Sequence, residues 1–79
     1  DLVLTKYGER TLVQAKRSQS RVSNRAVQEI VASLRLYKGS KGMVVTNNYF
    51  TKAAQELARA NDIELIDRDE LARWAETYL

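Results

Sequence analysis

The 79-residue sequence contains no cysteine, no histidine and no proline. These absences exclude disulfide bonds, thiolate zinc sites and histidine-based catalytic triads, and they leave the redox compartment undetermined. No apolar run approaches the roughly 20 residues of a membrane span, and no signal-peptide pattern is present. The glycine signatures of phosphate loops, dinucleotide sites and nucleophile elbows are also missing. Nucleophilic and dinucleotide chemistries are therefore disfavoured.

Two strands are predicted near the start of the chain, over residues 1–5 and 11–16, joined by a short turn. Gln14 and Lys16 are two residues apart, so their side chains share one face of the second strand. Antiparallel pairing about the turn brings Asp1 beside them. A carboxylate, an amide oxygen and an ammonium are thus predicted to converge at one end of the sheet.

Hydrophobic periodicity and turn signals predict three helices and two further strands. The helices are expected from Ser23 or Asn24 to about Lys38, from Thr51 to Asn61, and after the capping residues Asp67–Glu70. Their inward positions are expected to be Val27, Ile30, Val31, Leu34 and Tyr37; Ala54, Leu57 and Ala58; and Leu71, Trp74, Ala75 and Tyr78. The strands are expected at residues 43–46 and 63–66. The order β-β-α-β-α-β-α predicts one α/β domain over residues 1–79 with a mixed sheet.

Charge is distributed unevenly along the chain. Residues 1–52 contain ten Lys or Arg against three acids, a net charge of +7, whereas residues 53–79 have three against seven, a net charge of −4. A basic first half favours a polyanionic partner such as DNA. Phosphate contacts are expected from the basic loop and the start of the first helix, through Arg17, Arg21 and Arg25. Asn47, which follows the third strand at the carboxyl end where α/β sheets commonly bind ligands, is expected to contact DNA as well. The alternative is a solvated loop with ordinary turn residues.

The converging side chains suit metal-assisted hydrolysis of a phosphodiester. Asp1 would be the anionic ligand of a Mg²⁺ ion, with Mn²⁺ as an alternative, and Gln14 a neutral oxygen ligand. The carbonyl of Ala15 could add a third ligand. Lys16 would orient the attacking water and stabilise the developing charge. The alternative is that these are ordinary surface residues of a strand.

Four segments together resemble the catalytic domain of Mrr-type restriction endonucleases, in the PD-(D/E)XK nuclease superfamily. They are Asp1–Thr5, Leu12–Arg17, Val44–Thr46 with Phe50–Thr51, and Ile63–Asp67 with Glu70–Leu71. The resemblance implies a three-layer restriction-endonuclease-like core and a Mg²⁺-dependent, cytoplasmic endonuclease that acts on DNA. Asp1, Gln14 and Lys16 match the family's D…QxK positions. The family pattern begins with an upstream helix that bears a Glu, so the chain is expected to be a piece of a longer protein.

Two alternatives to a nuclease stay open at this point. The chain could be a non-catalytic module that keeps the fold and binds DNA or a partner chain. Alternatively, the first strand could pair with a second copy at a sheet edge and form a homo-oligomer. Replacement of Lys16 separates the first alternative from catalysis, because only a nuclease would lose cleavage while it keeps most of its DNA binding.

Overall fold

A computed structural model describes residues 2–6, 9–38 and 40–78, with the backbone alone described for residues 2–6 and Glu9. The elements are β1 (Leu2–Lys6), β2 (Glu9–Lys16), α1 (Asn24–Leu34), β3 (Ser40–Thr46), α2 (Lys52–Ala60), β4 (Ile63–Ile66) and α3 (Arg68–Tyr78). This is the predicted order, and β4 has the predicted bounds.

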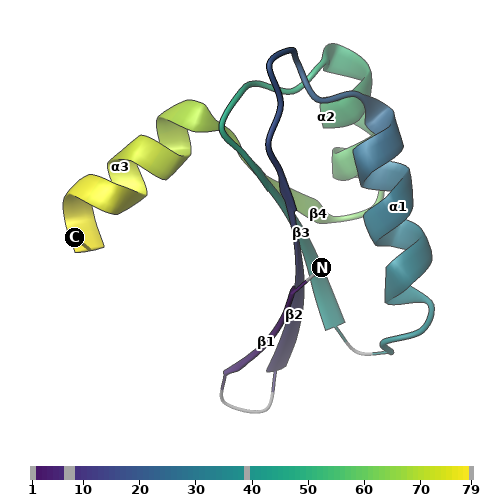
Figure 1. The fold of residues 1–79 in the computed structure, drawn as a ribbon. Helices are drawn as coiled ribbons and strands as arrows, with labels where there is room; N and C mark the ends of the chain where they lie inside the picture. Colours follow the sequence, from purple (N-terminus) through teal and green to yellow (C-terminus); the bar gives the residue numbers. More distant parts are fainter. Residues whose placement is uncertain (1, 7–8, 39, 79) are drawn as a thin grey trace.

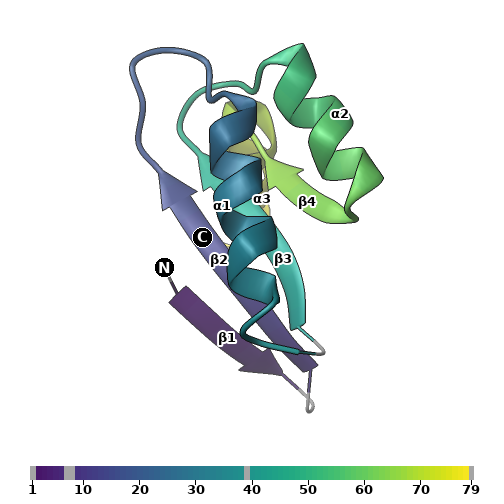
Figure 2. The same ribbon diagram turned by 90° about the vertical axis from the view of Figure 1, so that its right-hand side faces the viewer.

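The four strands form one sheet in the order β1-β2-β3-β4. β1 and β2 are antiparallel, with Leu2 opposite Val13 as the last described pair, and β2, β3 and β4 are parallel. The sheet is therefore mixed, as predicted. Helices α1 and α2 cover one face of it, and α3 lies on the other side, which gives three layers (Figures 1 and 2). The carboxyl ends of β2 and β3 meet at the edge where α1 begins, at the top of Figure 1.

The core lies between the sheet and the pair of helices α1 and α2. Alternate strand residues face it, and the helices contribute small or branched side chains at helical spacing. Its buried members are Leu12, Val22, Ala26, Val27, Ile30, Val44, Phe50, Ala54, Ala58 and Ile63. Burying one side chain of valine, isoleucine or phenylalanine contributes about 1.5–3 kcal/mol. Two polar residues, Gln14 and Thr46, are also buried on this face of the sheet.

The junction between α1 and β3 differs from the prediction. α1 ends at Leu34 instead of running to Lys38, and Tyr37, predicted to face the sheet, is 40% exposed. β3 begins at Ser40, three residues earlier than predicted, because residues 40–42 pair with residues 10–12 of β2. The glycine signal indicated a turn here, but long-range strand pairing prevails over local preference. Gly42 serves close packing, since an added Cβ would lie 2.7 Å from Ile63 Cδ1.

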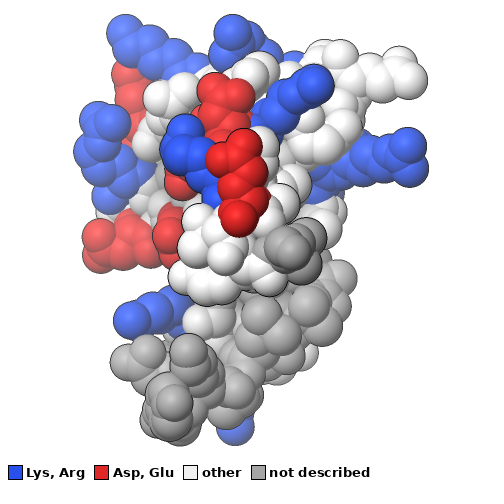
Figure 3. All heavy atoms as spheres, turned by 90° about the vertical axis from the view of Figure 1, so that its left-hand side faces the viewer, with Lys and Arg blue, Asp and Glu red and all other residues white. Residues whose placement is uncertain are grey.

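Helix α3 was predicted to bury its apolar stripe, and this is wrong. None of the described α3 residues is buried, and Leu71, Trp74 and Tyr78 are 37, 54 and 68% exposed. The stripe instead borders an open groove of about 700 Å³ on the second face of the sheet. Acidic and basic side chains are interspersed over this side of the molecule (Figure 3). Among the described residues no helix is long and apolar enough to cross a membrane.

Candidate functional site

Gln14 lies on the core face of β2, opposite Val44 of β3, and is only 7% exposed. Its neighbour on the same face is Lys16, the last residue of the strand, whose side chain is 35% exposed. The alternation of the strand thus directs both polar side chains towards α1, as the spacing predicts. Gln14 is not the ordinary surface residue of the alternative interpretation, because its amide is enclosed by the helix layer.

Both side chains meet one carboxylate oxygen on α1. Gln14 Nε2 donates a hydrogen bond to Glu29 Oε2 at 2.7 Å, and Lys16 Nζ donates to the same oxygen at 3.0 Å. The other carboxylate oxygen lies 3.9 Å from Nε of Arg25, a side chain that is 86% exposed. Gln14 Oε1 is buried and has no hydrogen-bond partner within the described part of the chain. A buried acceptor without a partner is costly, and such atoms often mark functional sites.

The electrostatics of the cluster keep Glu29 ionised. The hydrogen bond from Lys16 lowers the pKa of the Glu29 carboxyl below its ordinary value, the bond from Gln14 lowers it further, and partial burial opposes both. Glu29 is therefore a carboxylate near neutral pH, and its negative charge balances the positive charge of Lys16. The Glu29 side chain is 43% exposed, so water also reaches this ion pair.

The remaining predicted ligands are placed only in part. Asp1 lies outside the described residues. Ala15 lies between Gln14 and Lys16 in β2, opposite Val45 of β3. The described residues contain no group of three or more His, Cys, Asp or Glu side chains that could hold a metal ion. The Gln14 amide oxygen is the atom of the cluster without a hydrogen-bond partner among the described residues, and it is a ligand type that suits Mg²⁺, which keeps several of its waters and needs few oxygen ligands from protein.

The loop between β2 and α1 is fixed to the segment that follows β3. Asn47 Oδ1 accepts a hydrogen bond from the Ser18 backbone N–H at 2.8 Å, and Asn48 Nδ2 donates to the Ser18 carbonyl at 3.3 Å. The Val22 N–H donates to the Tyr49 carbonyl at 2.8 Å. The loop is thus held at both ends, and Asn47 shapes it through its side-chain oxygen. This arrangement holds the backbone of the loop that carries Arg17 and Arg21.

Arg17 and Arg21 of this loop and Arg25 of α1 line a hollow of about 300 Å³ beside Lys16 and Glu29, called the basic hollow below. Its charged lining consists of Lys16, Arg17, Arg21, Arg25 and Glu29. The three arginines are exposed, so the structure brings together three of the four residues predicted to contact DNA, and the fourth, Asn47, supports their loop. Four cations against one acid at the start of α1 favour a polyanion.

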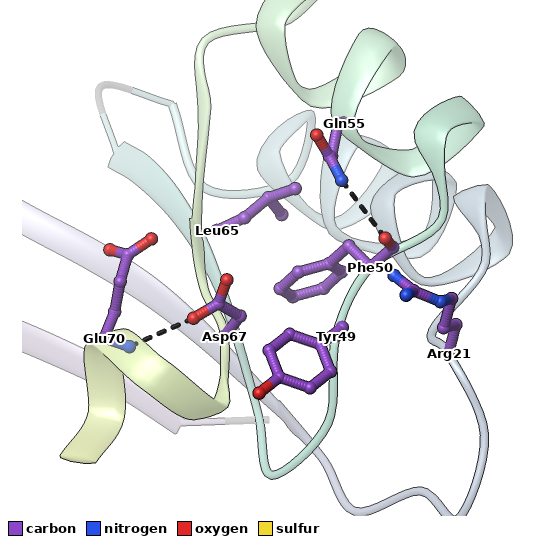
Figure 4. Close-up of a pocket in the computed structure, with 7 residues that line it drawn as sticks. All are labelled: Arg21, Tyr49, Phe50, Gln55, Leu65, Asp67 and Glu70. Carbon is purple, nitrogen blue, oxygen red and sulfur yellow. Dashed lines mark hydrogen bonds between the residues drawn. The ribbon is translucent and has the colours of Figure 1, made fainter.

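A second hollow of about 210 Å³ adjoins the basic hollow at Arg21 (Figure 4). The Arg21 guanidinium lies 5.7 Å from the centre of the Tyr49 ring, and the Tyr49 hydroxyl donates to Asp69 Oδ1 at 2.8 Å. That bond is the main reason why the pKa of Tyr49 is raised. Asp67 caps α3 by accepting from the Glu70 N–H at 3.0 Å, as the capping signal predicts. These contacts attach the start of α3 to the loop after β3.

Glu29 is the site residue that the sequence-based reasoning did not select. It is exposed, and it sits beside the buried stripe of α1, so periodicity assigns it to the solvated side of the helix. The usable signal is topological. A helix that directly follows a strand in a right-handed crossover places its first turns over the carboxyl end of that strand. An acid in the second turn of α1 is therefore close to Lys16.

The fold is a small three-layer α/β domain compatible with the restriction-endonuclease-like class. A family profile described as a restriction endonuclease, Mrr_cat, matches residues 1–75. The chain therefore belongs to the Mrr-type restriction endonuclease family. No curated protein and no solved structure matches it at a significant level.

Proposed function

We propose that the chain is the catalytic domain of a divalent-metal-dependent DNA endonuclease that hydrolyses phosphodiester bonds, with Mg²⁺ or Mn²⁺ as the ion. The observation that carries this proposal is the buried Gln14 oxygen, which lacks a partner among the described residues and belongs to a cluster at the basic hollow. Family membership supports the nuclease class. The cytoplasmic location expected from the sequence is part of the same proposal.

The residues of the chain would divide the work between binding and chemistry. Gln14 Oε1, Asp1 and the Ala15 carbonyl would hold the ion, which lowers the pKa of bound water and offsets phosphate charge when it is present. Lys16 Nζ would donate to the attacking water or to a phosphate oxygen, because it is a compact cation at the mouth of the site. The arginines of the basic hollow would contact the DNA backbone and fix its position without reading its sequence.

The test is nicking of supercoiled plasmid by the full-length protein in Mg²⁺, with an EDTA control. Lys16→Ala is compared with Lys38→Ala, because Lys38 is exposed beyond the opposite end of α1. The proposal predicts cleavage by wild type and Lys38→Ala, and none in EDTA or by Lys16→Ala. DNA binding of Lys16→Ala, measured by fluorescence anisotropy, should remain. No cleavage by wild type, or equal cleavage by Lys16→Ala, would leave a non-catalytic DNA-binding module as the better description.

A further inference from the structure

We propose that Glu29 is a positioning residue of this site: its carboxylate selects the orientation of the Gln14 amide and anchors Lys16 beside it. This inference deepens the proposed function and rests on it. It names a role for a helix residue that lies outside the D…QxK motif. The carboxylate of Glu29 supplies, from α1, the negative charge that β2 lacks at position 14.

The argument begins with the asymmetry of an amide group. A glutamine side chain can turn its NH₂ or its oxygen to a neighbour, and the two orientations occupy almost the same volume. A carboxylate accepts hydrogen bonds and cannot donate them. Glu29 Oε2, 2.7 Å from Gln14 Nε2, therefore selects the orientation in which the NH₂ faces α1. The Gln14 oxygen is then directed away from Glu29, where it is buried and has no partner among the described residues.

The same carboxylate oxygen also fixes Lys16. Lys16 Nζ lies 3.0 Å from Glu29 Oε2, so the amide donor and the ammonium share one acceptor atom. The third group that faces this carboxylate, Arg25, is farther away at 3.9 Å and largely exposed. Glu29 thus sets the distance between the two side chains that the proposed function uses. Partners of this kind, which orient a ligand without binding the ion, typically change metal affinity or activity by about 10–100-fold when they are removed.

The geometry predicts a specific coupling between positions 14 and 29. In the single variant Gln14→Glu, two carboxylates face each other where wild type has an N–H···O hydrogen bond of 2.7 Å, so the two side chains repel. A single Glu29→Gln change removes the negative charge that anchors Lys16, and the new amide can present its NH₂ as well as its oxygen, so position 29 no longer selects one orientation of Gln14. The double change Gln14→Glu with Glu29→Gln restores one donor, one acceptor and one negative charge in the pair. The double variant is therefore expected to recover the Mn²⁺ affinity and the kcat that each single variant loses.

The experiment measures Mn²⁺ affinity by isothermal titration calorimetry and the kcat and KM of plasmid nicking, on the full-length protein. Glu29→Gln is expected to weaken Mn²⁺ binding and to lower kcat by roughly tenfold each. KM for DNA should change little, because the arginines of the basic hollow remain. Glu56→Gln, at an exposed position of α2, is the matched control and should leave every value unchanged. Thermal unfolding of each variant checks that the fold is retained.

A separate readout follows the amide itself. The side-chain NH₂ signals of Gln14 in an ¹⁵N spectrum should shift in Glu29→Gln and remain in place in Glu56→Gln. Unchanged Mn²⁺ affinity and kcat in Glu29→Gln, or a double variant whose losses simply add, would overturn the role of Glu29. If wild type itself neither binds Mn²⁺ nor nicks DNA, the proposed function fails, and the role of Glu29 falls with it. The two failures are therefore distinguishable.

Discussion

Replacing Gln14 with methionine should make the fold more stable while it removes metal binding. Methionine is unbranched and similar in length, so it fits the same space on the core face of β2. The variant loses one hydrogen bond to Glu29, a net loss of about 1 kcal/mol, because Glu29 is 43% exposed and water can replace the donor. It also removes a buried acceptor without a described partner, which relieves roughly 1–3 kcal/mol.

The net effect is a gain of about 1 kcal/mol in the free energy of unfolding, since the relief exceeds the loss. In a domain of this size such a gain raises the melting temperature by roughly 4–8 °C. Urea unfolding in EDTA measures it directly. Gln28→Met, at an exposed position of α1, is the matched control and should stay within about 0.5 kcal/mol of wild type.

Adding Mn²⁺ should remove the stability advantage of Gln14→Met over wild type. At a free concentration ten times its dissociation constant, an ion that binds only the native state stabilises wild type by about 1.4 kcal/mol. Gln14→Met should gain nothing from the ion. Destabilisation of the variant by more than about 1 kcal/mol in EDTA would show that the amide serves the fold, and equal stabilisation of both proteins by Mn²⁺ would place the ion elsewhere.

Three further predictions follow from the described contacts. Arg21→Ala should reduce the slope of log DNA affinity against log salt by about one, whereas Arg35→Ala, at the far end of α1, should not; equal slopes would exclude Arg21 from phosphate contact. Because the folded-state pKa of Glu29 is lowered, its ionised form stabilises the fold above the ordinary glutamate pKa, and this stabilisation is lost as pH falls through the lower folded-state pKa. The stability difference between wild type and Glu29→Gln in EDTA should thus shrink as the pH falls below the ordinary glutamate pKa of 4.5 and through the lower folded-state pKa, and a constant difference would contradict this. Gly42→Ala should cost about 1–3 kcal/mol in urea unfolding, because its Cβ would lie 2.7 and 2.9 Å from the Cδ1 atoms of Ile63 and Leu34; no loss would show that these side chains move freely.

Most of the fold follows from the sequence because its signals are local. Thr51 accepts from the Ala54 N–H at 3.1 Å and begins α2, and the short apolar run of β4 has the predicted bounds. The start of β3 was harder to predict, because its first three residues carry turn signals and form a strand only by pairing with β2. That pairing is a long-range effect, which local preference does not contain.

Helix α3 shows a second feature that the sequence did not predict. Periodicity identifies the apolar side of a helix, but it does not say what that side contacts. The stripe of Leu71, Trp74 and Tyr78 borders the groove on the second sheet face, and no described segment covers it. The prediction of burial was wrong for that reason. The apolar surface itself is where the sequence places it.

The candidate site was also predictable from the sequence only in part. The spacing of Gln14 and Lys16 was enough to place both side chains on one face, and strand alternation made that reliable. Glu29 could not be chosen from its own helix, because its exposure is that of a surface residue and its role comes from contact with another element. Asp1 lies outside the described residues, so its part in the site stays a prediction.

The central claim is that the cluster of Gln14, Lys16 and Glu29 is the metal site. The most direct test is an anomalous difference map from crystals of the protein soaked in Mn²⁺. The account predicts a peak at inner-sphere distance, roughly 2.1 Å, from Gln14 Oε1, with the Gln14 NH₂ still bound to Glu29. In crystals of Gln14→Met the peak should be absent. A peak at another place, or an equal peak in the variant, would contradict the assignment of this cluster as the metal site of the nuclease.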